Sequence, residues 1–258
     1  MISPRRVRVI LGHELRLSIQ DPLPVMILLV FPIITMAFLK PAFRPALVQG
    51  GFAHANGSEQ VVPGQAVLSA FFIVSLTTFA FFAEFGWMTW DRLRASPASS
   101  LEIVLGKAIP RVAMVIVQLF VIIGAGVLLF DLHIQGDPRA LIPLVFVFSL
   151  ALVMLGVAVT AICRTAQQAN ACAVVGMMLF GAIGGALEPF NVLPQWAQTV
   201  APVTPTYWAM RGFHSVILDG RGLAAMAAPI CALGAMTLVF TAVSLRRLRF
   251  DEAKTAWA

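Results

Sequence analysis

The pair Gly106–Lys107 is where residue types and spacing come nearest to a phosphate-binding loop. The pair lies near the end of the stretch Thr89–Ala108, which reads TWDRLRASPASSLEIVLGKA. A phosphate-binding loop needs a Gly five residues before that Gly, so that the backbone can wrap the phosphates, and a Ser or Thr after the Lys for the metal. These two places hold Leu101 and Ala108. We therefore expect no ATP, magnesium or other cofactor to bind to this chain.

Other groups that carry out chemistry are scattered along the chain. The four histidines stand singly, and Cys163, Cys172 and Cys231 lie in apolar runs without the C-x-x-C spacing of a metal or redox site. The sequence contains no G-x-S-x-G nucleophile turn. It offers no catalytic or metal-binding residues, and we expect a protein that is not an enzyme.

The composition indicates a chain whose main solvent is lipid. Of its 258 residues, 59% are hydrophobic and 12% are charged, whereas soluble domains carry about 25% charged residues. A helix crosses the bilayer core with about 17–25 apolar residues, and six runs are long enough. They are Leu23–Leu39, Ala66–Trp90, Val112–Phe130, Leu141–Cys163, Ala169–Leu187 and Leu223–Leu245. We predict an all-α polytopic membrane protein with six transmembrane helices, formed as a single domain over residues 1–258.

The basic residues predict the direction of these spans. Six spans place both termini on one side, and thirteen of the 18 Lys and Arg residues then share that side. They are Arg5, Arg6, Arg8, Arg16, Arg92, Arg94, Lys107, Arg111, Arg164, Arg246, Arg247, Arg249 and Lys254. This excess follows the positive-inside rule, so the net charge of +6 indicates anionic lipid as the partner and not nucleic acid. We expect both termini in the cytoplasm, and Gly57 and Val203 outside.

Residues 4–21 are predicted to form an amphipathic helix in the membrane interface. At about 100° per residue, Arg16 falls on the basic side, and Asp21 with the proline after it ends the helix. Glu14 falls in the middle of the apolar arc. Two interpretations stay open, one in which Glu14 snorkels or caps a local group and one in which it is the buried partner of an arginine from a neighbouring helix.

Glu84 is a carboxylate near the end of the second span. A carboxylate at a helix centre costs about 2.5–3.5 kcal/mol on insertion scales, and less near the interface. We therefore expect Glu84 to be paired, with Arg92, Arg94 or an arginine of the interfacial helix as the counter-charge.

Residues 91–107 follow the second span on the cytoplasmic side. Trp90 and the alternating charges after it favour a short helix on the membrane, which Pro97 ends. Ser99 or Ser100 is a candidate N-cap for a new helix that leads into the third span, with Glu102 close behind. The alternative is a plain solvated turn, but a helix–helix connection needs only about two to eight residues.

Residues 188–222, between the fifth and sixth spans, are too long for a hairpin and too apolar for a free loop. We predict two short helices at or dipping into the outer leaflet, with tryptophan and tyrosine at the headgroup level. The candidate residues are Glu188, Pro189, Trp196, Pro205, Tyr207 and Trp208. This external gate segment either gates a pathway or forms a structural lid with no role in transport.

Three stretches together resemble a known family, the permease subunits of type-2 ABC exporters. The first is HELRLSIQDPLPVMILLVFP (13–32), which is similar to the family's interfacial helix and its entry to span one. The second, EFGWMTWDRLRASPASSLEIVLGKAI (84–109), is the most specific and resembles the family's loop after span two. The third runs from LGVAVTAICRTAQQANACAVV to EPFNVLPQWAQTVAPVTPTYWAMRG and is similar to the fifth span and external segment.

The resemblance implies a membrane-spanning subunit that pairs with a second permease, identical or homologous, in a bacterial plasma membrane. Two copies of a separate ABC ATPase subunit, which carry the ATP and Mg, would bind underneath. The residues that it assigns to ATPase coupling are Trp90, Asp91, Arg92, Leu93, Arg94, Ser96, Pro97 and Glu102. The expected cargo is hydrophobic or amphipathic, whether drug-like, lipid-linked or a glycan.

A secondary transporter or channel without an ATPase partner is the alternative. Such proteins usually carry ionisable groups near the middle of the membrane. Apart from Glu84, near the inner end of its span, the six predicted spans carry no charge between their ends, which favours the ATP-driven exporter.

Overall fold

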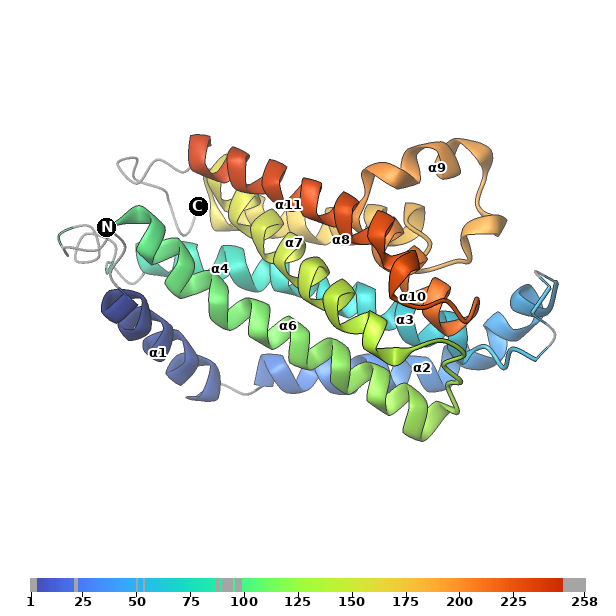
Figure 1. The fold of residues 1–258 in the computed structure, drawn as a ribbon. Coiled ribbons are helices and arrows are strands. Elements are labelled where there is room, and N and C mark those ends of the chain that lie inside the picture. The colour runs from blue at the N-terminus through green and yellow to red at the C-terminus, as the bar shows by residue number, and fades with distance from the viewer. Residues whose placement is uncertain are drawn as a thin grey trace.

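The computed structural model describes residues 4–20, 23–49, 51–52, 54–86, 89, 95 and 99–247. Within these residues the chain is helical without strands, and six helices are long and apolar enough to cross a membrane. The predicted all-α polytopic class is therefore confirmed. The long helices run side by side in an elongated bundle (Figure 1).

The helices keep the order of the predicted spans. They are α1 (Pro4–Gln20), α2 (Leu23–Gln49), α3 (Ser58–Ala70), α4 (Phe72–Gly86), α6 (Ser100–Phe130), α7 (Leu141–Ile162), α8 (Ala166–Ile183), α9 (Gln195–Val200), α10 (Pro205–Ile217) and α11 (Ala227–Arg247). The second span is α3 followed by α4, with a break at Phe71. We call the end that carries α1 and the start of α6 the basal end, and the opposite end, with α9 and α10, the distal end (Figure 1).

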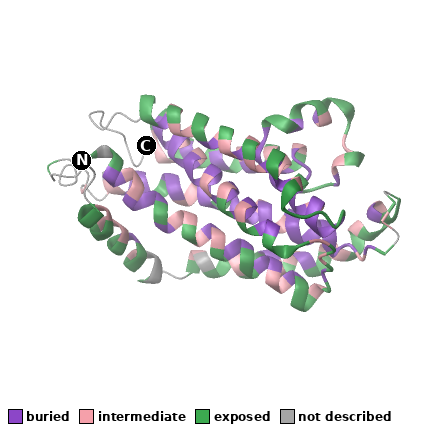
Figure 2. Ribbon diagram, viewed as in Figure 1, coloured by how far each residue is buried: buried purple, intermediate pink, exposed green. Residues whose placement is uncertain are grey.

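The core centres on α7, which packs against α4, α6 and α11. Its side chains Leu144, Phe148 and Leu152 are fully buried, and Figure 2 shows buried residues along the inner helices with exposed ones on the outside. Large apolar side chains such as Leu128 stay on that outer surface, where 84% of the residue is exposed. In a bilayer this outer surface faces lipid, so its exposure is expected of a membrane protein.

The first span is longer than predicted. The predicted spans cover Leu23–Leu39 and Ala66–Trp90, but α2 continues to Gln49 and α3 begins at Ser58. The extension is held from outside the helix, because Lys40 Nζ donates a hydrogen bond to the Phe130 carbonyl at 2.6 Å. Pro41 and Pro45 lie inside this helix, which is tolerated in membrane proteins because neighbouring groups can satisfy the backbone carbonyls that proline leaves free.

The third span begins earlier than the apolar run. Ser99 is the N-cap of α6 and forms a capping box with Glu102, as the cap prediction required. The helix predicted to lead into the third span is continuous with it, because α6 starts from this polar cap and carries Lys107 and Arg111 ahead of the apolar run that begins at Val112. The last part of the predicted coupling segment is thus already helical.

The chain between α8 and α11 contains two α-helices, as predicted, but they differ in how far they are buried in the bundle. The short α9 is mostly exposed, whereas α10 packs against α3, α7 and α11. Phe213, Val216 and Ile217 of α10 are fully buried. The depth of α10 makes it part of the bundle, not a loosely attached interfacial helix.

The orientation can be tested with cysteine labels at the two ends. Val203→Cys, in a background with all three native cysteines replaced by alanine, should react with an impermeant maleimide in intact cells, because Val203 is 75% exposed at the distal end. Arg164→Cys, between α7 and α8 at the basal end, should react only after lysis. The reverse pattern would overturn the predicted topology. Gly57 is a poor label site because its φ is +99° and a Cβ there would collide with the Lys40 carbonyl.

Candidate functional site

Lys107 sits at the centre of a charge cluster at the basal end. Its Nζ lies 2.6 Å from Glu14 Oε1 and 2.7 Å from Glu84 Oε1. The same Nζ donates a hydrogen bond to the Ala80 carbonyl at 3.0 Å and lies 5.8 Å from the centre of the Phe81 ring. All three ammonium donors therefore have an oxygen acceptor.

Arg111, one helical turn after Lys107, completes the cluster. Its Nη2 lies 2.8 Å from Glu14 Oε2, and its Nη1 donates to the Lys107 carbonyl at 2.5 Å. Glu14 comes from α1, Glu84 from α4, and both cations from α6. The charge cluster, defined by these four residues, is neutral in sum and joins three helices.

Gly106 brings α1 close enough for this pairing. A Cβ at Gly106 would lie 2.6 Å from Cγ2 and 2.7 Å from Cβ of Ile10, distances that real Cβ atoms do not adopt. The missing side chain lets α1 lie against α6, and the next residue, Lys107, then reaches Glu14. The Gly-Lys pair that resembled a phosphate loop is thus a helix-packing site followed by a buried cation.

Burial makes the pairing necessary. Side chains of Lys107 and Glu14 are 2% and 6% exposed, and that of Glu84 is 16% exposed. Burial by itself would raise the pKa of Glu14, but the charges of Lys107 and Arg111 offset it and hold the pKa below its ordinary value. Glu14 therefore stays ionised at neutral pH, and its stabilising contribution is lost only as the pH falls through its lowered pKa.

The charge cluster lies next to both ends of the segment that connects α4 to α6. At one end, the Thr89 hydroxyl donates to Glu84 Oε2, and the Thr89 amide donates to the Glu84 carbonyl at 3.0 Å. At the other, Glu102 accepts from the Ser99 amide at 2.7 Å and lies 3.7 Å from Arg6 Nη1 of α1. The residues predicted for coupling, apart from Glu102, lie outside the described part of the chain: Trp90, Asp91, Arg92, Leu93, Arg94, Ser96 and Pro97.

The structure settles the partners of both acidic residues. Glu84 is paired, as predicted, but its described partner is Lys107, and the proposed Arg92 and Arg94 are not described. Glu14 follows the second interpretation, since its partners Lys107 and Arg111 come from a neighbouring helix.

Lys107 and Arg111 were not predicted to be site residues. Their signal was present, because two basic residues four apart share one helix face. Of the remaining interfacial residues, Arg16 is exposed on α1, and Asp21 lies outside the described residues.

The external gate residues gather at the distal end, away from the charge cluster. Trp208 Nε1 donates to the Pro202 carbonyl at 2.8 Å, and its ring lies 5.1 Å from that of Tyr207. Pro205 begins α10, and Trp196 on α9 is 65% exposed. Glu188 is exposed and Pro189 is buried in the turn before α9.

Comparison with known proteins identifies a family match over most of the chain. The family profile described as "ABC-2 type transporter" matches residues 5–218. The "Probable multidrug ABC transporter permease YbhR" of Escherichia coli (strain K12) is 25% identical over 146 residues, which cover 56% of this chain and 40% of that protein. The "Linearmycin resistance permease protein LnrN" of Bacillus subtilis (strain 168) is 27% identical over 160 residues, covering 62% and 41%. The chain thus spans about two fifths of the length of these relatives. No solved structure gives a significant match.

The charge cluster predicts a large effect of removing its central cation. Lys107→Met leaves two buried carboxylates with one cation, and breaking a buried ion pair this way costs about 3–5 kcal/mol. We expect a loss of that order in the free energy of unfolding, measured by denaturant titration of the purified protein in detergent. Arg164→Met, on the exposed turn between α7 and α8, is the matched control and should change stability by less than about 0.5 kcal/mol. Equal stability of the two variants would contradict the role of Lys107.

Proposed function

Because the chain belongs to the ABC-2 type transporter family, we propose that it is the membrane-spanning permease subunit of an ATP-driven exporter. The observation that carries the proposal is the charge cluster, which fixes α1, α4 and α6 together beside the chain between α4 and α6. A push on that connecting chain would be passed to three helices at once.

We propose that a separate ATPase supplies this push. The sequence has no phosphate-binding loop at Gly106–Lys107, so ATP and Mg would bind to the partner, in two copies under a pair of permeases. Asp91, Arg92, Leu93 and Arg94 are the residues we expect to meet it. Leu93 would enter a pocket while the charges around it fix its orientation, as in other interfaces with an apolar centre and polar rim.

The hydrogen-bonded ends of the connecting chain favour mechanical coupling over a flexible tether. Thr89 is bonded to Glu84, and Ser99 is bonded to Glu102. Both acidic residues are connected to α1. Glu84 pairs with Lys107, which also pairs with Glu14 of α1. Glu102 lies 3.7 Å from Arg6 of α1. We propose that movement of the connecting chain is passed to the helices through these two acidic residues.

We propose a hydrophobic or amphipathic cargo of drug-like size. The two relatives are named for multidrug transport and linearmycin resistance, and the six candidate spans are apolar. The second permease, identical or homologous, would complete the pathway in the plasma membrane, with both termini in the cytoplasm. The external gate segment would then close the outer end.

The docking proposal can be tested by crosslinking and charge reversal. Arg94→Cys, without the native cysteines, should crosslink to the ATPase that copurifies with the permease. Reversing charge at Asp91 and Arg92 together should weaken ATPase association by about tenfold, because interface charges set orientation and association rate. Association would be measured by titration of the purified subunits.

Arg139→Cys at the distal end is the control for crosslinking, because it is exposed but lies far from the basal end. The six spans should still insert in the reversed variant, since no apolar run is changed. The docking proposal would be overturned if Arg94→Cys crosslinked no more than the Arg139→Cys control and the reversed variant associated normally with the ATPase.

A further inference from the structure

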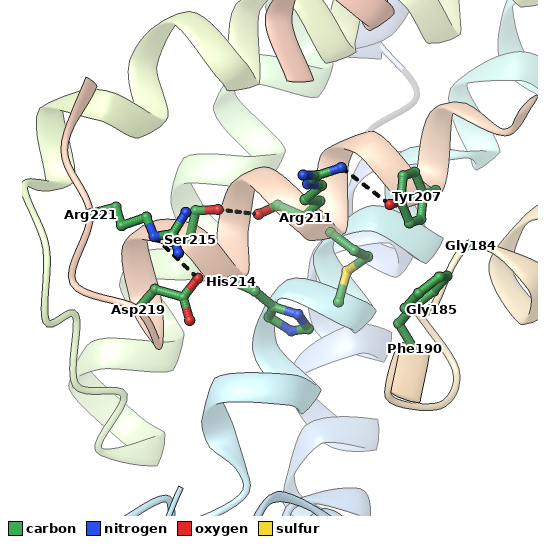
Figure 3. A pocket seen from close by; sticks show the side chains of 10 residues that line it. Gly184, Gly185, Phe190, Tyr207, Arg211, His214, Ser215, Asp219 and Arg221 are labelled. Atoms are coloured by element: carbon green, nitrogen blue, oxygen red, sulfur yellow. Dashed lines mark hydrogen bonds and ion pairs between the residues drawn. The ribbon is translucent and has the colours of Figure 1, made fainter. Parts of the chain in front are cut away.

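A cavity of about 330 Å³ lies at the distal end, between α10 and the turn that follows α8. Figure 3 shows Tyr207, Arg211 and His214 of α10 on one side, and Gly184, Gly185 and Phe190 on the other. None of these groups contributes to the charge cluster. The volume is within the range of small-molecule sites, about 300–1,000 Å³.

Arg211 is the main charge on the cavity wall, and its neighbours fix its position. Its Nη1 donates to the Tyr207 hydroxyl at 3.3 Å, and its guanidinium lies 5.5 Å from the centre of the Trp208 ring. Among the described residues, no carboxylate lies within ion-pair distance of it. A held guanidinium with spare donors is suited to a carboxylate or phosphate.

The second arginine of the wall is paired. Arg221 Nε lies 3.7 Å from Asp219 Oδ2, so the lining carries one net positive charge. The loop that holds this pair is fixed, because the Arg221 amide donates to the Ser215 carbonyl at 2.9 Å. A Cβ at Gly136 would lie 2.5 Å from the Arg221 carbonyl, so Gly136 permits this close packing.

Buried polar atoms without a hydrogen-bond partner gather around the same cavity. His214, which lines it, has an unpaired buried Nε2. Gln60 donates to the Gly185 carbonyl at 3.0 Å but leaves its Oε1 unpaired, and Thr206, whose Oγ1 is unpaired, packs on Gly184. Buried polar groups are normally satisfied, so this concentration indicates a place built for a polar ligand or ordered water.

Aromatic and apolar side chains also line the cavity. The ring centres of Phe190 and Tyr207 are 5.1 Å apart, and Met210 also lines the cavity. Burial lowers the pKa of His214 to about 4, so its imidazole is neutral at physiological pH and adds no charge. The lining thus combines one positive charge, hydrogen-bonding groups and an aromatic edge.

We propose that this distal cavity binds the anionic headgroup of an amphipathic molecule, with Arg211 as the residue that pairs with its carboxylate or phosphate. The aromatic edge formed by Phe190 and Tyr207 contacts the start of its apolar chain. A membrane lipid and a transported amphipath share this chemistry. Binding itself does not depend on the ATPase, and only use of the site by cargo rests on the proposed function.

The test uses octyl phosphate and octyl glucoside, which have the same chain but differ in headgroup charge. Native mass spectrometry of the purified permease counts the bound molecules. Octyl phosphate should bind at one per chain and at least about tenfold more tightly than octyl glucoside. Arg211→Gln should remove about tenfold of that affinity, as expected for one charge-assisted hydrogen bond, whereas Arg211→Lys should keep most of it.

Arg139→Gln is the matched control, because Arg139 is also exposed at the distal end but does not line the cavity. Phosphatidylglycerol that copurifies with the wild type and is lost in Arg211→Gln would support the site and identify a resident lipid. Octyl phosphate binding without retained lipid would support a site open to transported molecules. Equal binding of the two probes, or equal effects of Arg211→Gln and Arg139→Gln, would overturn the proposal, whether or not the permease binds its ATPase.

Discussion

The arrangement of the basal end depends on one buried ammonium group. Lys107 Nζ is nearly inaccessible to water and is stabilised by Glu14, Glu84 and the Ala80 carbonyl. An ion in this position is tolerated only while its partners stay in place. Since the partners come from α1 and α4, the cation fixes the relative position of three helices, and Gly106 allows the contact distance at which it can do so.

Charge and polarity are divided between the two ends of the bundle. The basal end holds the four-residue cluster, the distal end holds the cavity with Arg211, and an interior rich in apolar side chains around Phe148 lies between them. In the described spans the ionisable groups lie toward the two ends of the bundle: Glu84 and Lys107 belong to the basal cluster, and Lys40, within α2, reaches Phe130 at the end of α6. This placement is unlike the mid-membrane relay of a proton-driven transporter. Such a division suits a protein whose helices move as bodies in response to a force applied at one end.

The number of spans could be predicted because it depends on the length of each apolar run. The Ser99 cap could be predicted because it depends on the local spacing of Ser99 and Glu102. The partners of Glu84 and Glu14 could not, because they depend on how α4 and α1 pack against α6. The approach of α1 follows from the small size of Gly106 and not from any charge pattern. The extension of α2 beyond Leu39 likewise depends on a contact with Phe130, far away in the sequence. Helix α10 was expected at or dipping into the outer leaflet from its aromatic residues, and Phe213 and Val216 place its other face in the core.

The central claim is that α1 and α6 move as one body because the charge cluster joins them. The direct measurement is the distance between spin labels at Arg8→Cys on α1 and Val117→Cys on α6, both exposed positions, in the permease–ATPase complex with and without ATP. The native cysteines would be replaced in both the wild-type and Lys107→Met backgrounds. We expect one narrow distance, unchanged by ATP, when Lys107 is present, and a broad distribution with Lys107→Met. A distance that shifts with ATP while the charge cluster is intact would contradict the account.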